Sequence, residues 1–199
     1  MRGGVWGPTI ETVALVAAMF LVQTIVFAFG ASMELFALSA PFADRPWTLL
    51  TSIYAHGGIG HLVTNVVALV LFGLVVERHS SRWRFHSFVV LTGMLSGVAE
   101  VLVGSAIGPS PLVVGISGAV FALMGYILTS NPVTVTVLKR ANIDPKVQFA
   151  GMLVLALLIT WVTRGERVAL VAHFTGFLLG LIAGRLRLLR TTHPTSQAI

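Results

Sequence analysis

The chain has 199 residues, of which 56% are hydrophobic and only 10% are charged, and its mean hydropathy is +0.92. This composition excludes an ordinary soluble domain, in which about 25% of the residues are charged. The formal net charge of +6 does not indicate nucleic-acid binding, because the basic residues cluster in short segments between apolar runs. The chain has no cysteine, which excludes disulfides, thiolate metal sites and a cysteine nucleophile.

Six apolar segments are expected to cross a membrane, since a transmembrane helix needs about 20 mainly apolar residues. They are 10–29, 61–76, 86–105, 117–130, 147–163 and 168–186. The first is too long for a signal-peptide core and lacks a clear cleavage site, so we interpret it as a retained span. The sequence therefore predicts an all-α polytopic membrane protein, with one domain over 1–190 and a polar, disordered tail over 191–199.

Residues 30–60 separate the first two predicted spans and are too broken by proline and glycine to cross the membrane. They nevertheless carry several large apolar side chains. We expect a long amphipathic loop that lies in the membrane interface, with Trp47 and Tyr54 at the level of the lipid headgroups.

The distribution of lysine and arginine predicts which side of the membrane each loop occupies. Ten of the thirteen basic residues fall on one side: Arg2, Arg78, Arg82, Arg84, Lys139, Arg140, Lys146, Arg185, Arg187 and Arg190. Arg45, Arg164 and Arg167 fall on the other side. The positive-inside rule makes the first side cytoplasmic, so we expect a multi-pass protein of the cell membrane with both termini in the cytoplasm.

Ser117 opens the fourth predicted span, between Gly115 and Gly118 and after a proline-rich turn. The first backbone N–H groups of a helix lack intrahelical partners, and the positive end of the helix dipole favours a developing anion. Ser117 therefore fits a nucleophile beside an oxyanion site, and the two glycines would permit close approach of a substrate chain. The alternative, which this motif alone leaves open, is an N-cap serine flanked by helix-packing glycines.

His173 in the sixth predicted span is the candidate base for Ser117, because a free hydroxyl is a poor nucleophile. It shares a helical face with Gly176, Gly180 and Gly184, and Ser117 lies beside a similar face of small residues. Small residues let two transmembrane backbones approach closely, which is needed to bring a serine within about 3 Å of an imidazole. The alternative is a histidine that only forms hydrogen bonds between helices.

His61 and Asn65 lie four residues apart, and so on one face of the second predicted span. Both side chains can donate hydrogen bonds, so with the Ser117 backbone N–H they are candidates for an oxyanion site. The alternative is an interfacial histidine and a structural asparagine. Counting helix rise places these groups and His173 about 18 to 26 Å above the inner membrane boundary. We therefore expect all four side chains to meet in the outer half of the membrane.

These motifs together resemble those of the rhomboid proteases. The resemblance rests on three sets of residues: His56, His61 and Asn65; Gly115, Ser117, Gly118, Ala122, Leu123, Met124 and Gly125; and Ala172, His173, Gly176 and Gly180. It covers the chain from about Arg45 to Arg190 and implies a six-transmembrane-helix rhomboid-like bundle, with a Ser117 and His173 dyad that lacks an acid. It also implies an oxyanion site that includes His61 and Asn65, and a water-filled cavity open to the outer side. His56 matches an accessory histidine of the family.

The chain departs from the family pattern at two places. Phe121 stands where many members carry tyrosine four residues after the serine. Its ring can pack on the imidazole of His173 but offers no hydroxyl. The first loop reads Pro46, Trp47, Thr48, where a Trp-Arg pair is common. These differences concern the surroundings of the base and the hydrogen bonds of the loop.

Two carboxyl groups lie in or beside predicted spans. Glu77 stands next to Arg78 at the inner end of the second span, where it resembles a family glutamate, and we expect a structural ion pair. Glu100 lies inside the third span, where an ionisable group is by default a functional candidate. We expect it to be a neutral, hydrogen-bonded packing carboxyl.

The resemblance implies an intramembrane serine endopeptidase that cuts transmembrane segments of other membrane proteins through an acyl-enzyme, without metal or cofactor. The expected partners are transmembrane-helix substrates and the lipid bilayer. A zinc protease would need His-Glu-x-x-His on a helix, which is absent, and an aspartyl protease would need two intramembrane aspartates, whereas Asp44 and Asp144 lie in predicted loops. The alternatives are a rhomboid-like protein that binds client helices without cutting them, or a small transporter with a proton relay of His173 and Glu100.

Overall fold

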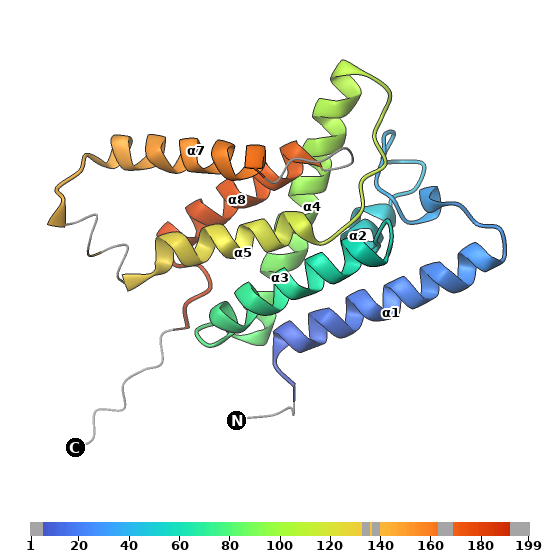
Figure 1. Cartoon of the computed structure of the whole chain (residues 1–199), viewed down its shortest axis with the longest axis horizontal. Helices are drawn as coiled ribbons and strands as arrows, with labels where there is room; N and C mark the ends of the chain where they lie inside the picture. Colours follow the sequence, from blue (N-terminus) through green and yellow to red (C-terminus); the bar gives the residue numbers. More distant parts are fainter. Residues whose placement is uncertain (1–5, 133–135, 137–139, 163–168, 192–199) are drawn as a thin grey trace.

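The structure is a computed structural model that describes residues 6–132, 136, 140–162 and 169–191 (Figure 1). The regular structure of these residues is helical. It comprises the 3-10 turn η1 (Met33–Leu35) and the α-helices α1 (Pro8–Ala28), α2 (Thr48–Tyr54), α3 (Ile59–Glu77), α4 (Arg82–Ile107), α5 (Ser117–Ser130), α7 (Pro145–Val162) and α8 (Leu170–Arg185). The prediction of an all-α fold is confirmed for this part of the chain.

Each of the six predicted spans coincides with a helix whose ends lie within a few residues of the prediction. The largest difference is at α4, which begins at Arg82 because the hydroxyl of Ser81 accepts the N–H of Arg84 at 3.3 Å and caps the helix. Among the described helices, α1, α3 and α4 are long and apolar enough to cross a membrane by themselves, whereas the apolar parts of α5, α7 and α8 are shorter. The count of six spans therefore stays a prediction.

Several residues used in the topology prediction lie outside the described part of the chain. They are Arg2, Lys139, Arg164 and Arg167, together with 192–199 of the predicted tail and the facing ends of the last two predicted spans, over 163–168.

Helix α5 occupies the centre of the bundle and packs against α3, α4 and α8 (Figure 1). Its contact with α8 is the most extensive between any two helices, because glycine and alanine line both faces. A Cβ atom added to Gly176 would overlap the carbonyl oxygen of Gly118, and one added to Gly180 would overlap the carbonyl oxygen of Ala122. The two backbones are therefore in direct contact, with no side chain between them.

The segment over 30–60 is more ordered than an interfacial loop, since it contains η1 and α2. Ile53 on α2 is 2% exposed and packs against Gly93 of α4, so burial against α4 explains a helix that hydropathy did not predict. The segment also pairs with the chain before α5, where Leu38 and Val113 exchange two backbone hydrogen bonds of 2.9 Å. The loop is thereby joined to the turn that carries Ser117.

Glu77 does not form the predicted ion pair, because no ion pair among the described residues includes it. Its carboxylate instead accepts the backbone N–H of Thr9 at 2.9 Å, at the beginning of α1. The N-terminus of a helix offers unpaired N–H groups and a positive dipole end, which satisfy a carboxylate as well as a cation does. The end of α3 is thus joined to the start of α1.

Replacing Gly180 with alanine is expected to destabilise the bundle. The added Cβ atom meets a backbone carbonyl of α5, which cannot move aside as a flexible side chain would. We expect a loss of about 1–3 kcal/mol, as for other overpacked sites. Thermal unfolding of the purified protein in detergent measures this loss. Gly151→Ala on α7 is the matched control, because nothing lies within 4 Å of its added Cβ; equal unfolding midpoints for the two variants would contradict the packing.

Candidate active site

Ser117 and His173 face each other where α5 and α8 begin. Ser117 is the first residue of α5, and His173 lies in the first turn of α8. The Oγ atom of Ser117 and the Nε2 atom of His173 are 3.0 Å apart, which is hydrogen-bonding distance. A serine hydroxyl in contact with an imidazole nitrogen is the arrangement in which the imidazole can take the hydroxyl proton.

The imidazole of His173 is held on several sides and is only 8% exposed. The ring of Phe121, one turn after Ser117, stacks on it with centroids 4.2 Å apart and planes 20° apart. The Nδ1 atom is buried and has no hydrogen-bond partner among the described residues. The described part of the chain thus supplies Ser117 on one side of the ring and no acid on the other.

The turn before Ser117 requires glycine at Gly115. Its φ angle is +117°, a conformation that other residues rarely adopt. A Cβ atom at Gly115 would lie 2.7 Å from Cε1 of His61 and 3.8 Å from Nδ2 of Asn65. Its N–H donates to the carbonyl oxygen of Ser52 at 2.8 Å, so α2 holds the turn in place. The structure therefore brings His61 and Asn65 against the turn that leads into Ser117.

The hydrogen bonds of α3 orient the two polar side chains beside this turn. Nδ1 of His61 is 3.4 Å from the backbone N–H of Gly57, so in the neutral ring it acts as the acceptor and Nε2 carries the proton. Nε2 is the ring nitrogen that lies close to Gly115. Nδ2 of Asn65 donates one hydrogen bond to the carbonyl oxygen of His61 at 3.0 Å, which leaves its second N–H for another acceptor.

Glu100 on α4 joins that helix to the first turn of α8. Its Oε2 atom accepts the backbone N–H of Ala172 at 2.9 Å, directly before His173. This N–H belongs to the first turn of α8 and has no partner within the helix. The expected hydrogen-bonded packing carboxyl is confirmed in its hydrogen bonding. The backbone partner, 72 residues away, could not be predicted from the sequence pattern.

Ser96, one helical turn before Glu100, is a residue that the sequence reasoning missed. A Cβ atom on Gly118 would lie 2.6 Å from the Cβ atom of Ser96, so Ser96 packs directly beside the start of α5. Its hydroxyl is buried without a hydrogen-bond partner among the described residues. No local motif marks this serine, and only the packing of α4 on α5 places it there.

His56 is buried beside the site, with its ring centroid 5.0 Å from that of His61. Gln23 of α1 holds its backbone in both directions, by accepting its N–H at 2.9 Å and donating to its carbonyl oxygen at 3.1 Å. Its Nδ1–H donates to the carbonyl oxygen of Tyr54 at 3.0 Å. Gln23 was not predicted as a site residue, although a polar residue inside an apolar span is a signal of such a contact.

Sequence similarity identifies the family to which the chain belongs. A sequence model described as the Rhomboid domain matches residues 43–190, which is most of the chain. The chain belongs to the rhomboid family. Together with helices that are long and apolar enough to span a bilayer, family membership makes this rhomboid an integral membrane protein.

Several curated relatives of this rhomboid carry related names. RHOMBOID-like protein 5 of Arabidopsis thaliana is 30% identical over 144 residues, which are 72% of this chain and 45% of the relative. Rhomboid-like protease 3 of Toxoplasma gondii is 28% identical over 135 residues, 68% of this chain and 49% of the relative. Rhomboid-related protein 3 of Homo sapiens is 38% identical over 78 residues, 39% of this chain and 18% of the relative. This rhomboid spans less than half the length of these relatives.

We expect the stability of this rhomboid to fall in acid because of His56. Burial lowers the pKa of His56 from 6.5 to about 4, with a smaller contribution from the nearby His61, while the hydrogen bond to Tyr54 opposes the shift. His56 is therefore protonated below about pH 6.5 in the unfolded chain, but only below about pH 4 in the folded protein. The contribution of neutral His56 to the free energy of unfolding is fully present above about pH 6.5 and is lost on acidification toward about pH 4. Near pH 5 the loss is on the order of 2 kcal/mol.

Thermal unfolding between about pH 7 and about pH 5 measures this effect. The variant His56→Gln removes the titrating group, so its unfolding midpoint should change less with pH than that of the wild type. An unchanged pH dependence in the variant would contradict the assignment to His56.

Proposed function

We propose that this rhomboid is an intramembrane serine endopeptidase that cuts transmembrane segments of other membrane proteins. The observation that carries the proposal is the 3.0 Å contact between Ser117 Oγ and His173 Nε2 at the start of α5, in a chain of the rhomboid family. His173 is buried and Ser117 is partly buried, on helices whose backbones touch, so the separation of the two side chains is fixed before substrate arrives.

The reaction proceeds in two half-reactions. Nε2 of His173 takes the proton of the Ser117 hydroxyl while Oγ attacks the carbonyl carbon of a substrate peptide bond. The tetrahedral intermediate collapses when the same imidazole returns the proton to the leaving amine, and an acyl-enzyme on Ser117 remains. Water then attacks the ester carbonyl, His173 again takes and returns a proton, and the new carboxyl end of the substrate leaves.

The oxyanion of each intermediate has three candidate donors. The N–H of Ser117 is the first of α5 and has no partner within the helix, and the positive end of the helix dipole adds to it. His61 and Asn65 face the turn before Ser117, where Nε2–H of the imidazole and the free N–H of the amide are the available donors. Such preorganised donors are usually the largest contribution to acyl-transfer catalysis.

Phe121 stacks on the base and offers it no hydroxyl. The parallel ring fixes the plane of the His173 imidazole while leaving Nδ1–H without a protein acceptor among the described residues. In this proposal the base is oriented by packing, and it works as the second member of a dyad.

The proposed setting is a bundle of six spans in the cell membrane, with both termini in the cytoplasm. In this orientation α5 and α8 begin near the outer surface, so the dyad opens toward that side and receives water from it. The substrate is a single transmembrane helix that must unwind near the cut, because helical peptide bonds are shielded and internally hydrogen-bonded. Glycine and proline near the cut would favour unwinding because both have low helix propensity. Alanine near the cut would help through its small size.

Replacing Ser117 with alanine is expected to abolish cleavage of a reconstituted transmembrane substrate, because no nucleophile remains. The wild-type protein should also react with a fluorophosphonate probe, and mass spectrometry should place the adduct on Ser117. Thermal unfolding of the variant controls for folding. A protein that binds client helices without cutting them, or a transporter, would not label. Persistent cleavage by a folded Ser117→Ala variant would refute the proposal.

Removing one of the α3 donors is expected to slow the reaction without preventing assembly of the dyad. Asn65→Leu keeps the side-chain size and removes the N–H, and we expect kcat to fall about 100-fold to 1,000-fold with little change in KM. Val63→Leu, an exposed position on the same helix, is the control. A kcat within a few fold of the wild type in Asn65→Leu would show that the amide is only structural.

A further inference from the structure

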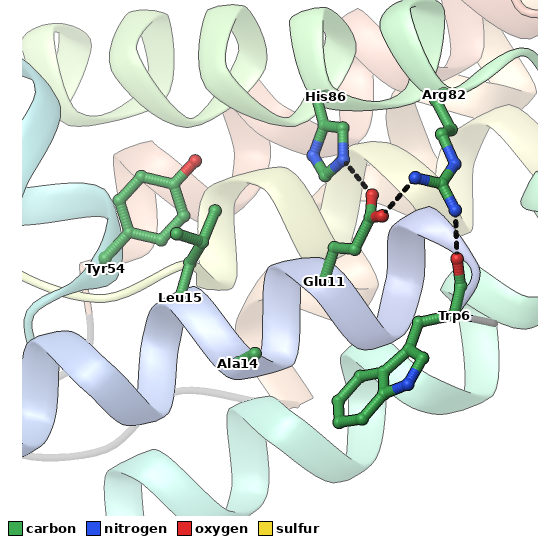
Figure 2. A pocket seen from close by; sticks show the side chains of 7 residues that line it. All are labelled: Trp6, Glu11, Ala14, Leu15, Tyr54, Arg82 and His86. Carbon is green, nitrogen blue, oxygen red and sulfur yellow. Dashed lines mark hydrogen bonds and ion pairs between the residues drawn. The ribbon is translucent and has the colours of Figure 1, made fainter. Parts of the chain in front are cut away.

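A pocket of about 670 Å³ opens between α1 and α4, beside Tyr54 of α2 (Figure 2). It is lined by Trp6, Glu11, Ala14, Leu15, Tyr54, Arg82 and His86. The rim of this pocket lies near the start of α1, which Glu77 joins to the end of α3. Asn65, near the start of α3, lies instead beside the Gly115 turn that leads into Ser117. The pocket therefore lies toward the other end of the bundle and is no part of the proposed active site.

The rim of the pocket is an ionic cluster that crosses from α1 to α4. Nη1 of Arg82 is 2.5 Å from Oε1 of Glu11, and Nε2 of His86 is 2.9 Å from Oε2 of the same carboxylate. The Nη2 atom of Arg82 also donates to the carbonyl oxygen of Trp6. The Arg82 side chain is nevertheless 45% exposed and that of Glu11 29% exposed, so both retain room for an external partner. A guanidinium has five N–H donors and a carboxylate about four acceptor sites, and only some are in use.

The interior of the pocket is apolar. Ala14 and Leu15 form one wall on α1, and the ring of Tyr54 closes the pocket toward α2 (Figure 2). Leu15 is 50% exposed, and the indole of Trp6 at the rim is 56% exposed, as is common for residues at a bilayer surface. An apolar slot that ends in charged groups at the ends of membrane helices has the polarity profile of a phospholipid, with its headgroup at the rim and an acyl chain inside.

The charges at the rim select among headgroups. One cation, Arg82, and one anion, Glu11, stand side by side, so their complement is a headgroup that also carries one anion and one cation. The phosphate oxygens of such a lipid accept hydrogen bonds from Arg82, and a primary ammonium donates to Glu11. A choline group has no N–H to donate, and a glycerol headgroup has no cation for Glu11. A serine headgroup has an ammonium but adds a second anion beside Glu11. Ethanolamine phosphate satisfies both side chains without an extra charge.

We propose that this pocket binds one molecule of phosphatidylethanolamine, with its phosphate on Arg82, its ammonium on Glu11 and the first part of an acyl chain against Leu15 and Tyr54. This lipid site is independent of the proteolytic activity proposed above. It bridges α1 and α4, so the lipid adds a contact between two helices that the ion pair already connects.

Native mass spectrometry of the delipidated full-length protein tests the site, with phosphatidylethanolamine, phosphatidylcholine and phosphatidylglycerol of identical acyl chains. We expect one molecule of phosphatidylethanolamine to bind about tenfold more tightly than either other lipid, as expected for a hydrogen bond to a charged group. Glu11→Gln should reduce the preference over phosphatidylcholine to near one. Arg78→Gln, an exposed cation that does not line the pocket, should leave the preference unchanged.

A second pair of variants leaves the ionic cluster intact. Leu15→Trp fills the apolar part of the pocket and should abolish the preferential binding, whereas Leu21→Trp places the same side chain at an exposed position of α1 that does not line the pocket. Equal retention of the three lipids by the wild type, or retention by Leu15→Trp equal to that by Leu21→Trp, would overturn the proposal. Because the readout does not involve Ser117, either result leaves the proteolytic function to its own test.

Discussion

The direct contact between the backbones of α5 and α8 is the constraint on which the rest of the site depends. A serine side chain is short, so its hydroxyl reaches an imidazole on another helix only if the two helices approach more closely than side chains usually allow. Gly176 and Gly180 meet this requirement, because a Cβ atom on either would overlap a carbonyl oxygen of α5. Within a bilayer, where apolar burial does not drive helices together, such packing is itself a source of stability.

Two further contacts fix the ends of these helices where the dyad lies. The carbonyl oxygen of Ser52 on α2 holds the Gly115 turn that leads into α5, and Glu100 on α4 holds the first turn of α8. The nucleophile candidate and the base candidate are therefore each supported by a different element. The short loop helix α2, which spans no membrane, positions the site through the backbone alone.

The sequence predicted those features that local pattern encodes. Hydropathy located the six longest helices to within a few residues, and small-residue spacing around Ser117 and His173 predicted helices that touch. Long-range partners could not be predicted in this way. Glu77 was expected to pair with its neighbour Arg78, but its carboxylate meets the backbone of α1 instead. Helix α2 was missed because its apolar face is short and is buried against α4, where hydropathy alone indicates an interfacial loop.

The polar groups of this apolar chain are divided between two levels of the bundle, and α4 passes both. Arg82 at its start joins the ionic cluster with α1, and Glu100 near its other end caps α8 beside His173. The two residues are 18 positions apart on the helix, a distance of about 27 Å that approaches the thickness of the hydrocarbon core. Charged groups are costly between these levels, so each cluster must satisfy its own hydrogen bonds locally. A headgroup bound at the ionic cluster therefore contacts α4 far from the dyad. The lipid and the substrate would occupy separate sites on the same bundle.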